Sequence, residues 1–123
     1  MKRLSLFIYF FLITVLQAAA QQSFDKTAVK SVMKRVADWQ IANPNKGAEH
    51  DDLDWTHAAL YMGMLDWAEL TEKEDSDDSY YQWLLRIGQR NHFQIGKWMY
   101  HADFIAVGQP FIDLYLKYGN KKM

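Results

Sequence analysis

Apolar residues recur at three- and four-residue steps along most of this chain, a spacing that predicts α-helices. The first predicted helix, residues 26–41, has apolar residues on one side and lysine or arginine on the other. It ends at "ANPNKG", where Pro44 and Gly47 both oppose continuation of a helix. Its apolar stripe consists of Val29, Val32, Val36 and Trp39 or Gln40.

Two later segments are apolar on nearly every face, and a one-sided helix lies between them. Residues 54–70 contain the run "AALYMGML", and residues 103–118 have a similar character. A helix that is apolar all round has to be buried on more than one side. The intervening helix, residues 79–90, follows the acidic stretch "EDSDDS", which supplies N-cap candidates. Its predicted buried stripe consists of Tyr80, Trp83, Leu84 and Ile87.

The resulting order of outer, inner, outer and inner helix repeats at a fixed interval. Gly63 and Gly108 lie 45 positions apart, each among bulky apolar residues, and close helix packing is the expected reason for both. Helical hairpins with such a period are typical of stacked or toroidal helix pairs. No segment has strand-like alternation, so the predicted fold class is all-α. Two hairpins alone would leave apolar surface exposed, so we expect extensive dimerisation or hairpins that this chain lacks.

The first 20 residues have the layout of a signal peptide. Basic "MKR" precedes an apolar stretch, and "AAA" before Gln21 supplies small residues for cleavage. The apolar run from Leu4 to Ala20 is shorter than the roughly 20 residues that span a bilayer. We therefore expect cleavage of residues 1–20, export to the periplasm or the medium, and no membrane anchor. The mature domain would be residues 21–123.

Composition narrows the classes of function. Loss of Lys2 and Arg3 with the leader takes the formal charge from −1 to −3, which gives no electrostatic case for binding nucleic acid. The chain has no cysteine, so core burial rather than disulfides has to stabilise it. All five tryptophans lie after the leader. They suit a helical core, and they also suit stacking on sugars.

Polar residues gather where both inner helices begin. If the two hairpins stand side by side, these residues share one edge of the fold, called the rim below. A carboxyl group beside an apolar wall can act as a general acid, and a tryptophan there could stack on a sugar ring. The rim residues are His50, Asp51, Asp52, Asp54, Trp55 and His57 of one helix start and Tyr100, His101 and Asp103 of the other.

Structural roles compete with each of these hypotheses. Taken alone, Asp54 is more often a helix N-cap, Trp55 more often a core residue, and His101 more often a capping or surface histidine. His50, Asp54 and His57 have a spacing that could hold a metal. Histidine pairs with scattered acids are nevertheless common at solvated helix starts, so no metal site is predicted.

Three segments resemble one group of enzymes: "DWTHAALYMGMLDWAE", "YYQWLLRIGQRNHFQIGKWMY" and "HADFIAVGQPFIDLYLKYGN". They are similar to the N-terminal third of the unsaturated glucuronyl and rhamnogalacturonyl hydrolases, glycoside hydrolase families 88 and 105. The resemblance covers about residues 25–123, and "HAD…GQ…LYLKYG" is its most specific part. It implies an (α/α)6 toroid, of which this chain would hold about two helical hairpins, the first third.

The resemblance also implies an activity. These enzymes release 4,5-unsaturated uronic acid from oligosaccharides, here of the pectin-derived rhamnogalacturonan type, by hydrating its double bond without a metal or organic cofactor. By motif position, Asp103 matches a catalytic aspartate, while Trp55, His101 and Asp54 are candidates for substrate binding. Many relatives carry a second acid where this chain has Phe104.

The same resemblance places the family's other active-site aspartate, and the basic residues for the uronate, on later hairpins. Residues 1–123 alone are therefore expected to be inactive and poorly soluble. Two alternatives stay open at this stage. One is a non-catalytic secreted module that binds or dimerises through its hairpins, and the other is an (α/α)6 enzyme for saturated glycosides.

Overall fold

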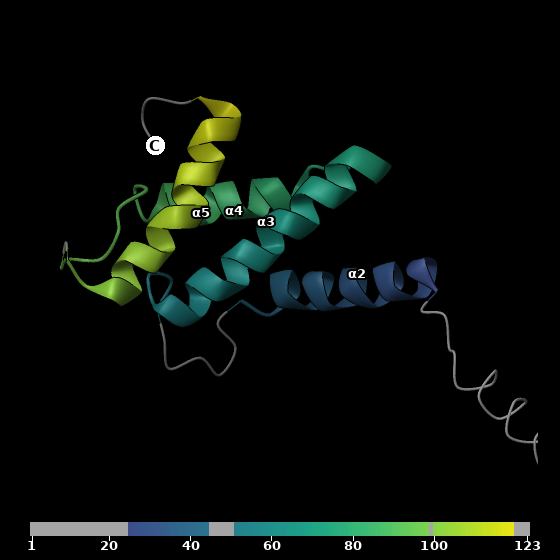
Figure 1. Cartoon of the computed structure of the whole chain (residues 1–123), viewed down its shortest axis with the longest axis horizontal. Helices are drawn as coiled ribbons and strands as arrows, with labels where there is room; N and C mark the ends of the chain where they lie inside the picture. The colour runs from purple at the N-terminus through teal and green to yellow at the C-terminus, as the bar shows by residue number, and fades with distance from the viewer. Residues whose placement is uncertain (1–24, 45–50, 99, 120–123) are drawn as a thin grey trace, which may run out of the picture. The chain divides into compact units, whose positions relative to one another are not determined.

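The structure, a computed structural model, describes residues 25–44, 51–98 and 100–119 of the chain. These residues form four helices and, within those ranges, no strand, which confirms the all-α prediction. The expected leader lies outside the described residues. The helices are α2 (Lys26–Ala42), α3 (Trp55–Asp75), α4 (Ser79–Arg90) and α5 (Ala102–Tyr118) (Figure 1).

Residues 1–32 and 33–123 form two separate units, so α2 passes from one into the other, and the core and the site lie in the second. None of the helices in the described residues has both the length and the hydrophobicity that crossing a bilayer would require.

α3 continues five residues beyond its predicted end at Leu70. The side chain of Thr71 is buried, and its hydroxyl donates to the carbonyl oxygen of Trp67 at 3.1 Å. Ser76 then ends the helix in the left-handed conformation, with φ of 57°, and its N–H donates to the carbonyl of Glu72. The apolar periodicity stops at Leu70, whereas the polar residues after it still favour a helix. Periodicity alone therefore placed the end too early.

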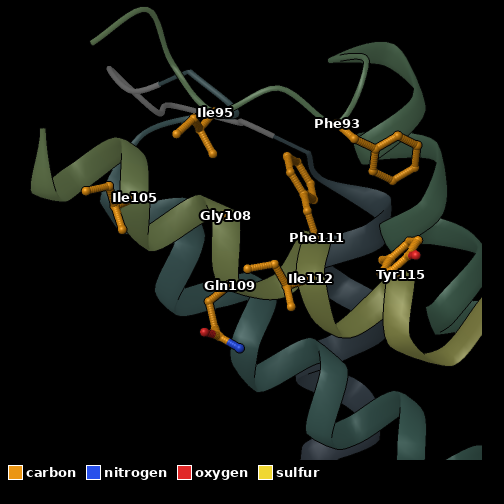
Figure 2. A pocket seen from close by; sticks show the side chains of 8 residues that line it. All are labelled: Phe93, Ile95, Ile105, Gly108, Gln109, Phe111, Ile112 and Tyr115. Carbon is orange, nitrogen blue, oxygen red and sulfur yellow. The ribbon is translucent and has the colours of Figure 1, made fainter. Parts of the chain in front are cut away.

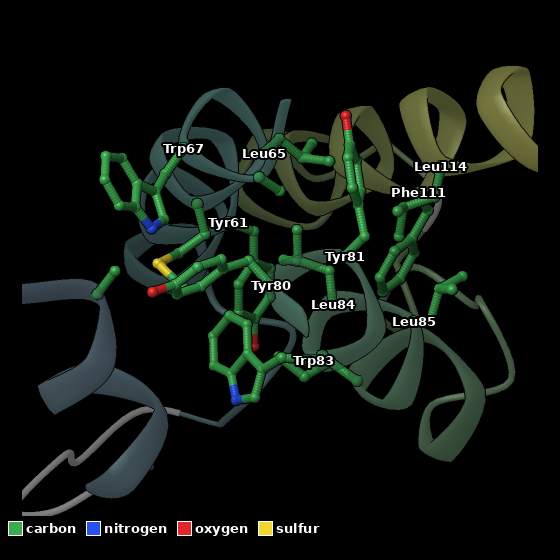
Figure 3. Packing of buried hydrophobic residues seen from close by; sticks show 14 of the residues in the cluster. Tyr61, Leu65, Trp67, Tyr80, Tyr81, Trp83, Leu84, Leu85, Phe111 and Leu114 are labelled. Atoms are coloured by element: carbon green, nitrogen blue, oxygen red, sulfur yellow. The ribbon is translucent and has the colours of Figure 1, made fainter. Parts of the chain in front are cut away.

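The core lies where α3 packs against α4 and α5 (Figure 3). Two edge-to-face pairs join α3 to α4. The ring centroids of Tyr61 and Trp83 are 5.9 Å apart, and those of Trp67 and Tyr80 are 5.7 Å apart. Such pairs add about 0.5–1.5 kcal/mol to the free energy of burial. The predicted stripe of α4 is buried, which confirms its one-sided character; it comprises Tyr80, Trp83, Leu84 and Ile87.

Within the second unit, a polar network joins α2 to α4. Asp38 accepts a hydrogen bond of 2.6 Å from the hydroxyl of Tyr80 and one of 2.8 Å from Nζ of Lys34. Val36 and Trp39, members of the predicted stripe, are 63% and 57% exposed. The apolar spacing is therefore present in the sequence of α2, but Val36 and Trp39 face solvent in the described structure.

Removing the Asp38 carboxylate should lower stability in a pH-dependent way. The hydrogen bond from Lys34, followed by that from Tyr80, holds the pKa of Asp38 below its ordinary value of 3.8. A lowered carboxyl pKa stabilises the fold above pH 3.8, and this contribution is lost as the pH falls through the lowered pKa. We expect Asp38→Asn to cost up to about 1 kcal/mol at neutral pH, because the network is largely exposed. Urea unfolding of both proteins measures this cost, and a penalty that persists after acidification below the native pKa would contradict it.

Neither inner helix is buried all round in the described structure, so that prediction is wrong for this chain. α3 exposes Ala59, Gly63 and Asp66 along one side. α5 exposes a row of apolar residues, and a groove of about 480 Å³ runs along it beneath Phe93 and Ile95 (Figure 2). The exposure of apolar surface expected for two isolated hairpins is thus observed. The exposed row comprises Ile105, Ile112, Tyr115 and Leu116.

Gly63 offers a test of helix propensity. A Cβ added at Gly63 would have no neighbour within 4 Å, so the close packing predicted there is absent. We expect Gly63→Ala to raise the free energy of unfolding by about 0.5–1 kcal/mol, since alanine costs less backbone entropy in a helix. Gly108→Ala is the matched control, because its Cβ would lie 3.2 Å from Cγ2 of Ile95. Equal gains at both positions, measured by urea unfolding, would show that packing at Gly108 has no effect.

Candidate functional site

The two inner helices begin at the same end of their shared interface. α3 packs directly against α5, and Figure 1 shows both N-terminal ends on one side of the unit, from which the helices diverge. This arrangement is the one from which the rim was predicted. Its side chains differ widely in what they contact.

Asp54 is the N-cap of α3. Its backbone is extended, with φ of −78° and ψ of 150°, and its Oδ1 accepts hydrogen bonds of 3.1 Å from the backbone N–H and from the hydroxyl of Thr56. An N-cap of this kind stabilises a helix by about 1 kcal/mol. The structural alternative for Asp54 is therefore confirmed, and a contact with substrate would have to use a carboxylate that already caps the helix.

Trp55 and His57 follow Asp54 but have opposite environments. Trp55 is 53% exposed, and its indole makes no ring contact with another aromatic residue in the described ranges, so the core alternative is wrong. His57 is buried and stacks on Tyr61 at 5.9 Å. Trp55 is thus available to a ligand, whereas His57 belongs to the core.

Only two of the three residues considered for a metal, Asp54 and His57, lie in the described part of the chain. His50 lies outside the described residues, and His57 points into the core. Within the described ranges, no group of three or more histidine, cysteine or acidic residues has the geometry of a metal site.

Asp103 lies in the first turn of α5, and its side chain is 47% exposed. One carboxylate oxygen is 3.7 Å from Nδ1 of His101, an ion-pair distance when the imidazole is protonated. His101 occupies the N-cap position, but its side chain makes no capping hydrogen bond. Its Nδ1 has no hydrogen-bond partner among the described residues. Its side chain therefore does not cap the helix, but it is 43% exposed, which agrees with the surface alternative, and its Nδ1 lies nearest the carboxylate of Asp103.

A cluster of three rings surrounds the start of α5. Ring centroids of His101 lie 5.5 Å from Trp98 and 5.1 Å from Phe104, and those of Trp98 and Phe104 are 5.9 Å apart. Trp98 is 59% exposed, so one member of this aromatic cluster faces solvent. The ring of Phe104 covers Gly96, where an added Cβ would approach it to 2.3 Å. Only glycine at position 96 leaves room for the ring.

The aromatic cluster was not among the features predicted from the sequence. The available signal was the spacing of aromatic residues at positions 98, 101 and 104, three residues apart across a helix start. Phe104 supplies an apolar ring to this cluster.

Residues 12–123 match the model of a protein family described as Glycosyl Hydrolase Family 88. The chain belongs to glycosyl hydrolase family 88. The match covers all the described residues and begins within the expected leader. Searches of curated proteins and of solved structures gave no significant match.

The rim of this family 88 chain has the groups that proton transfer next to a sugar requires. Asp103 presents a half-exposed carboxyl group in the first turn of α5. Nδ1 of the His101 imidazole lies 3.7 Å from that carboxyl group. Exposed indoles at Trp55 and Trp98 offer apolar faces for sugar rings.

Proposed function

We propose that the family 88 protein containing these residues removes 4,5-unsaturated uronic acid from the non-reducing end of oligosaccharides. The observation that carries the proposal is Asp103, a half-exposed carboxyl group beside His101 at the start of an inner helix. Family 88 membership supports an enzyme rather than a non-catalytic binding module. The proposed substrates are rhamnogalacturonan fragments from pectin, the class to which family 105 of the resemblance also points.

In the proposed reaction Asp103 donates its proton to the carbon of the double bond that is remote from the ring oxygen. Water adds its oxygen to the other carbon of that bond, which carries the ring oxygen, and its released proton passes to a general base. The resulting hemiketal opens to a ketone, after which the sugar attached at the anomeric carbon is released. A carboxyl group suits this step because it can be protonated and close to a water at once. The step needs no metal or organic cofactor.

The other rim residues have supporting roles in the proposal. Trp55 stacks on the unsaturated sugar ring, and His101 orients the carboxyl group of Asp103 through the 3.7 Å contact. Asp54 holds the first turn of α3 in place and so orients Trp55. The protein is proposed to act after export, in the periplasm or outside the cell, on oligosaccharides and not on nucleic acid.

A panel of substrates tests the proposal on the full-length enzyme. We expect an unsaturated rhamnogalacturonan disaccharide to lose its double-bond absorbance faster than an unsaturated disaccharide from a glycosaminoglycan. Faster turnover of the glycosaminoglycan disaccharide would still support the proposed hydration reaction but would overturn the assignment of pectin fragments as substrates. Hydrolysis of a saturated uronide alone would favour an ordinary two-carboxylate glycosidase and contradict the proposed function.

A further inference from the structure

A charged clamp joins the segment before α3 to the end of α4. The side chain of Asp52 receives two hydrogen bonds from Arg90, Nε to Oδ2 at 2.5 Å and Nη2 to Oδ1 at 2.6 Å. Asn91 adds a third, from Nδ2 to Oδ2 at 2.9 Å, and the same amide reaches the carbonyl of Ile87 at 3.0 Å. The side chain of Asp52 is only 14% exposed, whereas that of Arg90 is 51% exposed. Two-point pairing of this kind fixes orientation as well as distance.

The position of Asp52 is unfavourable without Arg90. Arg90 is the last residue of α4 and Asn91 is its C-cap, so the carboxylate lies at the negative end of the helix dipole. A cation is favoured at that position, and an anion is not. The guanidinium compensates for the charge of Asp52, and the hydrogen bonds to Asp52 raise the pKa of Arg90. The pair therefore acts as a unit that ties residue 52 to α4.

Asp52 is linked to the start of α3 by a short turn that contains two hydrogen bonds. The side chain of Asp51 accepts a hydrogen bond of 2.9 Å from the N–H of Leu53. The backbone carbonyl of Asp51 accepts a hydrogen bond of 3.1 Å from the N–H of Asp54. Asp54 then caps α3, and the exposed indole of Trp55 follows immediately. Displacement of residue 52 would thus be passed to the first turn of α3 through three consecutive residues.

We propose that Arg90 and Asp52 are positioning residues that fix the angle at which Trp55 meets the unsaturated sugar. Neither residue contacts substrate in this proposal, which rests on the function proposed above for the same rim. Arg90 acts from α4, a helix that carries none of the rim residues. A lysine in its place keeps the charge but loses the two-point geometry, so it restores the clamp only in part.

Two variants of the full chain separate positioning from general stability. Arg90→Gln removes the clamp at the N-terminal end of α3. Lys117→Gln is the matched control, because it removes an ion pair of 2.5 Å to Glu72 near the C-terminal end of the same helix. We expect amide hydrogen exchange at Thr56 to become about tenfold faster in Arg90→Gln and to stay unchanged in Lys117→Gln. Arg90→Lys should give an intermediate rate.

Titration with an unsaturated uronyl disaccharide, followed through the indole signals by NMR, tests the link to Trp55. We expect Arg90→Gln to weaken binding about three- to tenfold in the wild-type background and to have no further effect in a Trp55→Ala background. Additive effects in the double variant, or unchanged exchange at Thr56, would overturn the proposal. If the wild-type protein binds no disaccharide, the proposed function fails. In that case the exchange rate at Thr56 and the Trp55 indole signal still decide whether the clamp orients this residue.

Discussion

Asp103→Asn is expected to lower kcat of the enzyme on an unsaturated disaccharide by about 10²–10⁴-fold, the usual contribution of a positioned general acid. The amide has nearly the same shape as the carboxyl group, so the start of α5 and the ring contacts of His101 should persist. The amide, unlike the carboxyl group, cannot donate a proton to the carbon of the double bond. Loss of double-bond absorbance over time measures the effect, and KM should change little.

Asp113→Asn is the matched control for this variant. Asp113 lies in the same helix and accepts a hydrogen bond of 3.1 Å from Gln109. It is ten positions after Asp103 and has no role in the proposed reaction. We expect its kcat to stay within about twofold of wild type, consistent with a surface substitution. Equal losses in both variants would indicate a general effect on α5, and full activity in Asp103→Asn would remove Asp103 from the mechanism.

Leu84→Ala is expected to cost about 2–5 kcal/mol of unfolding free energy, the range measured for buried leucines that leave a cavity. Leu84 is 2% exposed and lies in α4 next to Trp83, within the buried core. For a small domain with a total stability of about 5–15 kcal/mol, this is a large fraction. Urea unfolding followed by circular dichroism gives the value.

Leu116→Ala makes the same chemical change at a site that is 73% exposed. Its expected cost is below about 0.5 kcal/mol, because little apolar surface leaves the core. A large loss at Leu116, comparable to that at Leu84, would mean that the exposed row on α5 is covered in solution. The pair of variants therefore tests the core and the exposed face together.

The positions of the helices could be predicted from sequence because the signals are local. The apolar period, the capping residues and the helix-breaking residues predicted the four helices of the described residues. The predicted C-cap Gly119 ends α5 in the left-handed conformation, with φ of 62°. The packing face of α2 could not be predicted, since it depends on the hydroxyl of Tyr80, which lies 42 residues from Asp38 along the chain. Likewise, the residues that continue α3 beyond Leu70 are polar, so the apolar period does not include them.

The candidate site was predicted only in part, because some of its contacts depend on the path of the loops between helices. Asp103, His101 and Trp55 could be selected from their places at helix starts and from a family motif. The contact of Trp98 with Phe104 could not, because it depends on the path of the chain after α4. That path passes through His92 and Phe93, which adopt φ of 55° and 52°, values uncommon for residues other than glycine. The pairing of Asp52 with Arg90, 38 residues later, has no local signal either.

The most direct test of the account is to run the enzyme's reaction on an unsaturated rhamnogalacturonan disaccharide in deuterated water. Protonation of the double bond predicts one solvent deuterium on the former vinyl carbon of the released acid, together with loss of the double-bond absorbance. Asp103→Asn should show neither. Release of the sugar with the double bond intact and no deuterium on carbon would mean cleavage at the anomeric carbon, and the proposed hydration would then be wrong.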